Sequence, residues 1–194
     1  MKIIALLHTD SASESLCLKP TLSYPDSSIV KNGNPFFIPD FDTSFKGLPF
    51  LAVKISRLGK NVAQRFVSRY YSEVAPVMAI YAANLLNALK AQGLPWTIAT
   101  GFDKSLAVGS FKSYPQLYEN GPMILEDHIC VKRELQIPKP EEIAIAVSEV
   151  SRYNSLKMGD LILIPLSADP VELKIDSLLT ISSGDETLLK LPVK

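Results

Sequence analysis

Short apolar runs alternate with polar positions along this chain, and Pro, Gly and Asn separate them at short intervals. That spacing is typical of many short strands rather than long helices. Residues 48–56 are a predicted strand, because large apolar side chains recur at Leu51, Val53 and Ile55. Asn32-Gly33 predicts a tight turn, and hence a hairpin that joins residues 28–30 to 35–38. Further strands are expected at residues 1–7, 77–81, 161–164, 177–181 and 187–191.

Three segments have the pattern of helices. Residues 82–91 place Leu85, Leu86 and Leu89 on one face, and Gly93 follows near the C-cap position. A short amphipathic helix is expected over residues 62–68.

The clearest helix runs over Pro140–Tyr153. Proline suits the first turn, and Glu141 and Glu142 complement the positive end of the helix dipole. One apolar stripe follows, made of Ile143, Val147 and Val150. Together the elements predict an α+β fold that is mainly β.

Length and charge narrow the classes of protein further. A chain of 194 residues suits one domain, residues 1–194. Its 20 basic and 20 acidic residues balance, so bulk charge recruits neither nucleic acid nor an anionic membrane. The longest apolar stretch, residues 74–89, contains Pro76, Asn84 and Asn87 and is too short for a membrane span. We therefore expect a cytoplasmic protein with no nucleic-acid or membrane partner.

Residue types that carry chemistry are sparse. Cys17 and Cys130 have no metal-binding spacing, so two reduced thiols are favoured over a disulfide. His8 and His128 are 120 residues apart and are interpreted as surface or core histidines rather than as ligands or bases.

Two pairs of acids have a structural and a chemical interpretation. Asp40 and Asp42 place carboxylates at i and i+2, which suits a divalent cation, although the neighbouring Pro39 and Thr43 favour a turn. Glu141-Glu142 is interpreted as helix-start electrostatics rather than an acid–base pair, because adjacent helical residues do not face each other.

Five motifs, taken in order, resemble the fumarylacetoacetate hydrolase family, and within it the small acylpyruvase and oxaloacetate decarboxylase-like branch. They cover nearly all of the chain after about residue 17. The motifs are Lys19-Pro20, residues 32–41 (NGNPFFIPDF), residues 57–62 (RLGKNV), residues 93–97 (GLPWT) with Phe102-Asp103, and residues 155–162 (SLKMGDLI). The resemblance implies a mixed β-sheet roll in a single domain with a shortened N-terminal segment.

The same resemblance implies a metal site whose ligands this chain lacks. Family members bind Mg²⁺ or Mn²⁺ through Glu-x-Glu on one strand and Asp on the next, and the metal polarises a β-keto acid. Leu48 and Phe50 fall at the two glutamates, and Ala79 falls at the aspartate. No glutamate occurs between Glu14 and Glu73, so a small shift in alignment restores neither ligand.

Other departures concern the family's substrate pocket. Thr100 stands where a lysine is expected, and Pro165-Leu166-Ser167 replaces a Gly-Thr-Pro loop. The segment that carries a histidine–glutamate acid–base pair is shortened to residues 8–18, where His8 and Glu14 lack the family spacing. Lys19 is retained, and Lys46 falls at the histidine that precedes Glu-x-Glu. The resemblance thus assigns Lys19, Lys46, Leu48, Phe50, Ala79 and Thr100 to a vestigial substrate pocket with no catalytic residue and no metal ligand.

Three functions stay open on this basis. The first is a non-catalytic binding or regulatory protein without a cofactor, which forms a homodimer or pairs with an active paralogue. The alternative is a Mg²⁺- or Mn²⁺-dependent hydrolase or decarboxylase of a small β-keto acid, whose ligands would lie at positions other than those of the family pattern. The third is a metal-independent enzyme or small-acid binder in which Lys19 and Lys46 supply positive charge.

Overall fold

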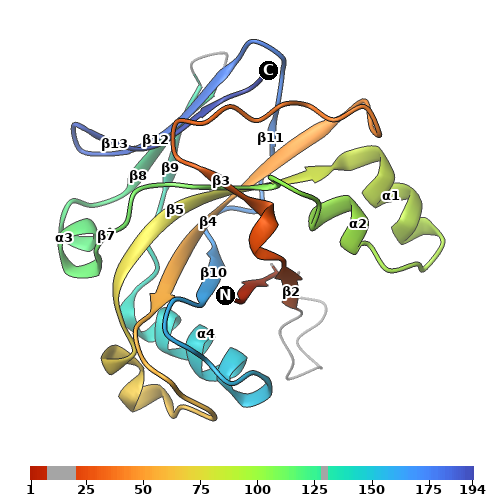
Figure 1. The fold of residues 1–194 in the computed structure, drawn as a ribbon. Helices are drawn as coiled ribbons and strands as arrows, with labels where there is room; N and C mark the ends of the chain where they lie inside the picture. Colours follow the sequence, from red (N-terminus) through yellow and green to blue (C-terminus); the bar gives the residue numbers. More distant parts are fainter. Residues whose placement is uncertain (8–20, 128–130) are drawn as a thin grey trace.

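Two β-sheets form the body of the protein, seen in a computed structural model that describes residues 1–7, 21–127 and 131–194 (Figure 1). The strands of the larger, nine-stranded sheet are β1 (Ile3–Leu6), β2 (Thr21–Tyr24), β3 (Ile29–Lys31), β4 (Phe45–Ile55), β5 (Tyr71–Ala82), β6 (Leu106–Val108), β7 (Lys112–Ser113), β10 (Leu161–Pro165) and β11 (Val171–Glu172). The strands of the smaller sheet are β8 (Met123–Glu126), β9 (Lys132–Leu135), β12 (Leu178–Ser183) and β13 (Glu186–Pro192). The helices are α1 (Ala83–Ala91), α2 (Thr97–Thr100), α3 (Tyr114–Glu119) and α4 (Pro140–Tyr153), with 3₁₀ turns η2 (Asp26–Ser28) and η3 (Gln64–Arg69).

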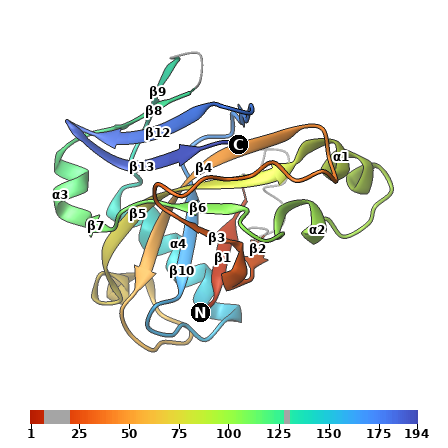
Figure 2. The same ribbon diagram turned by 45° about the horizontal axis from the view of Figure 1, so that its top comes forward.

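The larger sheet is mixed, with strand order β2-β1-β10-β4-β5-β6-β3. β1 pairs in parallel with β10, and β3 pairs in parallel with β6, whereas β4 and β5 form a long antiparallel pair through its middle. The second view shows the smaller sheet lying across one face of this pair (Figure 2). The predicted α+β, mainly β roll is therefore confirmed.

Side-chain alternation along β4 divides the sheet into two apolar faces. Leu51, Val53 and Ile55 join the larger core, which also contains Val147 of α4 and Ile181 of β12. Burying each such side chain contributes about 1.5–3 kcal/mol to stability. The alternate residues of β4 point the other way, toward β2 and the helices α1 and α2. This second face carries the candidate site.

Helix α4 begins and ends as the sequence predicts. Pro140 opens it, and the Glu142 carboxylate accepts a hydrogen bond from the Lys139 backbone N–H at 2.7 Å. The interpretation of Glu141-Glu142 as helix-start electrostatics is thus supported by a direct cap. Ile143, Val147 and Val150 are buried on one stripe.

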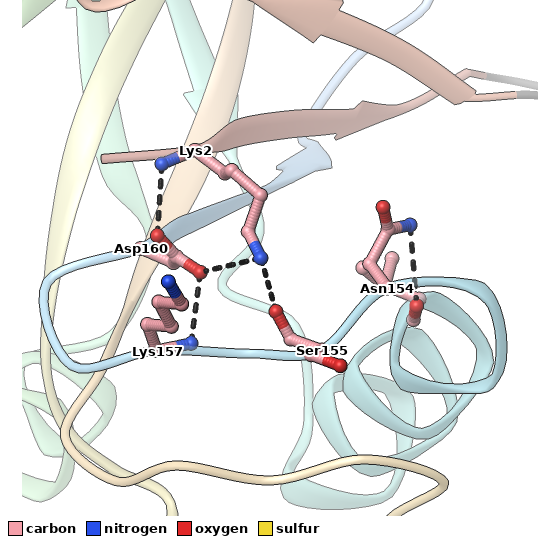
Figure 3. A network of polar contacts seen from close by, with 6 residues as sticks. Lys2, Asn154, Ser155, Lys157 and Asp160 are labelled. Atoms are coloured by element: carbon pink, nitrogen blue, oxygen red, sulfur yellow. Dashed lines mark hydrogen bonds and ion pairs between the residues drawn. The ribbon is translucent and has the colours of Figure 1, made fainter.

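The buried carboxylate of Asp160 ties the N-terminal strand to the turn that precedes β10 (Figure 3). It accepts hydrogen bonds from the backbone N–H groups of Lys2 and Lys157, both at 2.8 Å. The ammonium group of Lys2 lies 3.3 Å from the same carboxylate and also donates to the carbonyl of Ser155. Asp160, which belongs to the motif at residues 155–162, is therefore structural: it fixes the start of the parallel β1–β10 pair.

Some local predictions are corrected by the structure. The hairpin through Asn32-Gly33 is wrong, because β3 pairs in parallel with β6 and Phe36 forms an isolated parallel bridge with Val193. The strand expected at residues 77–81 is the end of β5, which begins at Tyr71. The amphipathic segment expected at residues 62–68 is the 3₁₀ turn η3.

Among the helices of the three described ranges, none is both long enough and apolar enough to cross a membrane.

Candidate functional site

The C-terminal end of α1 positions one edge of the site. Gly93 adopts a left-handed conformation (φ 66°), which glycine tolerates without strain. The Gly93 N–H donates to the carbonyl of Lys90 at 3.1 Å, and the Leu94 N–H donates to the carbonyl of Leu89 at 2.9 Å. This pair of bonds is a Schellman motif. It turns the chain back so that the Trp96 ring lies 4.8 Å from the Lys90 ammonium group.

Strands β4 and β5 supply the floor of the site. Leu48 lies directly opposite Ala79 in the antiparallel register, and Phe50 lies opposite Val77. Because side chains at i and i+2 of a strand share a face, Leu48, Phe50 and Ala79 project from the same side of the sheet. Phe50 and Ala79 are buried, at 3% and 4% exposure.

A cavity of about 400 Å³ lies over this floor. That volume falls in the range of small-molecule sites, which are typically about 300–1,000 Å³. Its apolar lining is Leu7, Leu22, Leu48, Phe50, Ala79 and Leu86, and its polar lining is Tyr24, Tyr81, Lys90, Trp96 and Thr100. The structure thus brings together four of the six residues that the family resemblance assigned to a pocket, namely Leu48, Phe50, Ala79 and Thr100.

Two tyrosines give the cavity neutral hydroxyl groups. Burial raises the pKa of Tyr24 to about 12, and burial also raises the pKa of Tyr81. Both hydroxyls are therefore protonated at neutral pH and available as hydrogen-bond donors.

Thr100 closes α2 and is buried. Its hydroxyl lies 3.4 Å from the Trp96 carbonyl and 3.5 Å from the Thr97 carbonyl, which are long contacts with its own helix. A short hydroxyl in this place cannot supply the charge that a lysine would bring.

The two lysines expected in the pocket have different outcomes. Lys46 lies next to Tyr81 in the β4–β5 register, and Tyr81 lines the cavity, but Lys46 itself is not part of the lining. Lys19 lies outside the described residues, as do His8, Glu14, Cys17, His128 and Cys130. The roles expected for these residues stay predictions.

Oxygen and nitrogen ligands for a metal ion are scarce around the cavity. Within residues 1–7, 21–127 and 131–194, no group of three His, Cys, Asp or Glu side chains lies close enough to hold a metal ion. The described cavity lining contains neither carboxylate nor imidazole. A hard cation such as Mg²⁺ needs several oxygen ligands, so this lining does not fit one.

Asp42, considered as a cation ligand from its spacing with Asp40, instead caps α1. Its carboxylate accepts hydrogen bonds from the backbone N–H groups of Leu85 at 2.9 Å and Ser44 at 3.1 Å, and from the Asn84 amide at 2.8 Å. Partial burial by itself would raise the pKa of Asp42, but these hydrogen bonds outweigh it and lower the pKa below its usual value. The alternative interpretation, a turn with side-chain-to-backbone bonds, is confirmed.

Asp42→Ala is expected to lower the free energy of unfolding by about 1 kcal/mol at neutral pH, the typical value of a helix cap. The folded-state pKa lies below that of the unfolded chain. The contribution of Asp42 is therefore complete above about pH 4 and is lost as the pH falls through the folded-state pKa. Urea denaturation of both proteins between pH 7 and pH 2.5 measures this difference. A stability gap that grows toward low pH would contradict the assignment.

Sequence reasoning missed seven residues of the cavity lining, and three of them, Tyr24, Tyr81 and Lys90, carry hydroxyl or ammonium groups. Tyr24 belongs to a four-residue strand whose burial does not follow from its own sequence. Lys90 was visible as a residue on the last turn of a predicted helix that leads into Gly93 and Trp96. That proximity in sequence was the available signal.

The fold is a mixed β roll with a cavity over its central strand pair. Comparison with known proteins shows which proteins share this fold and resemble the sequence. No protein-family model matches the chain. The mitochondrial oxaloacetate tautomerase FAHD1 of Rattus norvegicus is 28% identical over 153 residues, which are 76% of this chain and 66% of the relative. The Arabidopsis thaliana protein of the same name is 29% identical over 163 residues, 80% of this chain and 70% of the relative. The chain thus spans about two thirds of the length of these curated relatives.

Solved structures share the fold. A protein of Yersinia pestis assigned to the fumarylacetoacetate hydrolase family superposes with a TM-score of 0.83 at 18% identity, covering 100% of this chain and 93% of that one. Fumarylpyruvate hydrolase of Pseudomonas aeruginosa, solved with Mn²⁺ and pyruvate, superposes with a TM-score of 0.76 at 16% identity, covering 99% and 88%. The chain thus shares the fold of fumarylacetoacetate hydrolase family proteins, and its sequence is similar to the curated oxaloacetate tautomerases.

Proposed function

We propose that this protein is a non-catalytic member of the fumarylacetoacetate hydrolase family. It binds a small molecule, without a metal ion, in the cavity that lies over strands β4 and β5. The observation that carries the proposal is the convergence of Leu48, Phe50 and Ala79 on one cavity wall. These are the positions at which the resemblance places the family's three carboxylate ligands.

Electrostatics at the cavity support the same proposal. A divalent cation is stabilised by negative charge and by oxygen ligands in near-octahedral geometry. The described lining offers alkyl groups, aromatic rings, hydroxyls and the ammonium group of Lys90. The ammonium group would repel a cation, and no carboxylate of the described lining offsets it. We therefore assign no reaction step to a metal ion in this chain.

The relatives favour a second candidate function. The curated relatives are named oxaloacetate tautomerase, and one structural neighbour is a fumarylpyruvate hydrolase solved with Mn²⁺ and pyruvate. A metal-dependent hydrolase, decarboxylase or isomerase of a small β-keto acid is therefore the alternative. Such an enzyme would need metal ligands from outside the described residues, because the described lining supplies none.

An activity assay separates the two candidates. The purified protein is incubated with oxaloacetate and with an acylpyruvate, in millimolar Mg²⁺ or Mn²⁺ and separately in EDTA, beside an active relative as positive control. The proposal predicts no difference between the metal and EDTA reactions of this protein. Turnover that EDTA abolishes would contradict it and establish the alternative.

Association with a second chain belongs to the same proposal: a homodimer, or a pair with an active paralogue. Light scattering coupled to gel filtration should give twice the chain mass of 21.3 kDa for the homodimer. A chain that elutes as a monomer, alone and after mixing with such a paralogue, would contradict both forms of association.

A further inference from the structure

Tyr24 presents an unused hydroxyl group to the cavity. Its side chain is buried, at 7% exposure, and it lines the cavity. Among the described residues it has no hydrogen-bond partner, whereas Tyr114, a tyrosine of similar burial, donates to the carbonyl of Pro138 at 2.9 Å. The Tyr24 hydroxyl is therefore free to donate a hydrogen bond to a ligand in the cavity.

Charge in the described cavity lining has one sign. Lys90 is the only residue of this lining that carries a charge at neutral pH, and no carboxylate belongs to it. The Lys90 ammonium group is held against the Trp96 ring at 4.8 Å, so its direction is restrained by a cation–π contact. Lys90 also has no ion-pair partner among the described residues, so its charge is available to an anion.

The remaining wall is apolar. Leu22, Leu48, Phe50 and Leu86 offer alkyl and aromatic surface, and Phe50 lies within strand β4. Packing the hydrocarbon part of a ligand on this wall removes apolar surface from water, which favours binding. A compact dicarboxylate has too little hydrocarbon surface to cover this apolar wall.

We propose that the cavity binds an amphipathic monocarboxylate. Its hydrocarbon body packs on Leu48 and Phe50, Tyr24 donates a hydrogen bond to its carboxylate, and the Lys90 ammonium group balances the carboxylate charge. This inference rests on the proposed metal-independent function and specifies its ligand. A metal-chelating keto acid has its charge balanced by the metal ion. For the monocarboxylate proposed here, the Lys90 ammonium group balances the charge and the Tyr24 hydroxyl donates a hydrogen bond.

Isothermal titration with octanoate tests the proposal, in buffer that contains EDTA. Octanamide serves as the uncharged analogue of the same length, and succinate as a short dicarboxylate. We expect octanoate to bind at least tenfold more tightly than octanamide, a difference of about 1.4 kcal/mol. Succinate should show no binding at millimolar concentration, because it lacks the hydrocarbon body.

Two variants and one control assign the contacts. Tyr24→Phe keeps the ring and should weaken octanoate binding tenfold or more, because only the hydroxyl is lost. Lys90→Met, at an exposed position that leaves the fold intact, should remove the preference for octanoate over octanamide. Tyr153→Phe changes an exposed tyrosine on α4, outside the cavity lining, and should bind octanoate as the unmodified protein does.

The binding and activity measurements distinguish failure of the proposed ligand class from failure of the proposed function. Absence of octanoate binding at millimolar concentration, or equal binding by the unmodified protein and Lys90→Met, would overturn the inference. If that result came with no EDTA-sensitive turnover, the proposed metal-independent function would stand and only its ligand class would fall. EDTA-sensitive turnover of a keto acid would overturn the proposed function itself.

Discussion

Phe50→Glu is expected to lower the free energy of unfolding by about 3–5 kcal/mol, the range for loss of a buried aromatic side chain. Phe50 is 3% exposed in the middle of β4, and its neighbours in the second core include Ala52, Val77 and Tyr24. A glutamate there loses the packing of the ring and places a carboxylate against apolar groups, which adds a desolvation cost. Urea denaturation followed by circular dichroism measures the change. Phe50→Leu, which keeps an apolar side chain, should cost about 1 kcal/mol.

Manganese distinguishes lost packing from a concealed metal site. Millimolar Mn²⁺ should not raise the melting temperature of Phe50→Glu, because one carboxylate is too few for a hard cation. The triple variant Leu48→Glu, Phe50→Glu, Ala79→Asp places three carboxylates on one face, and Mn²⁺ should raise its melting temperature. If Mn²⁺ stabilised the single variant as much as the triple one, further ligands would already be present at the cavity.

Asp160→Ala should lower the free energy of unfolding by about 2–4 kcal/mol. The substitution leaves the backbone N–H groups of Lys2 and Lys157 without their carboxylate acceptor, and each unsatisfied donor costs about 1–3 kcal/mol. Its ion pair with Lys2 adds little, because the lysine side chain is 40% exposed. The matched control is Lys157→Ala, which keeps the backbone N–H and should change stability by no more than about 0.5 kcal/mol.

Hydrogen exchange locates the Asp160 effect. In Asp160→Ala, amide protection should fall first at the β1–β10 pair, whose register begins at Ile3 opposite Leu161. Uniform loss of protection through both sheets, with no excess at β1 and β10, would contradict the role assigned to Asp160 in Figure 3.

Elements with strong local signals were predictable from the sequence. Proline, two glutamates and an apolar stripe define α4, and its bounds agree with the prediction. Helix α1 starts one residue later than predicted and ends at the predicted residue, because Gly93 ends it by a purely local backbone preference. Alternation of side chains likewise located β4.

Elements whose structure depends on distant partners were not predictable. Asn32-Gly33 is a good local hairpin signal, yet the Gly33 N–H donates to the carbonyl of Lys190 at 2.9 Å and the Asn32 side chain accepts from the Lys190 N–H at 2.8 Å. Residues far apart in the chain thus override the local preference. The same holds for β2, which becomes a strand only by pairing with β1.

The candidate site divides in the same way. Its floor was predictable, because the resemblance gives Leu48, Phe50 and Ala79 and strand periodicity places them on one face. The hydrogen-bond donors of the site could not be predicted from the sequence. Tyr24 reaches the cavity from β2, and the approach of Lys90 to Trp96 depends on the backbone turn after α1.

Titration of Mn²⁺ by electron paramagnetic resonance tests the metal-independent function most directly. The signal of free hexaaqua Mn²⁺ is recorded at a fixed micromolar concentration of metal while the unmodified protein is added to a large excess. We predict that the signal stays at its protein-free intensity, since the described cavity lining offers no carboxylate or imidazole ligand. Loss of the signal with a stoichiometry of one Mn²⁺ per chain would contradict the proposal and show that this chain holds a metal ion.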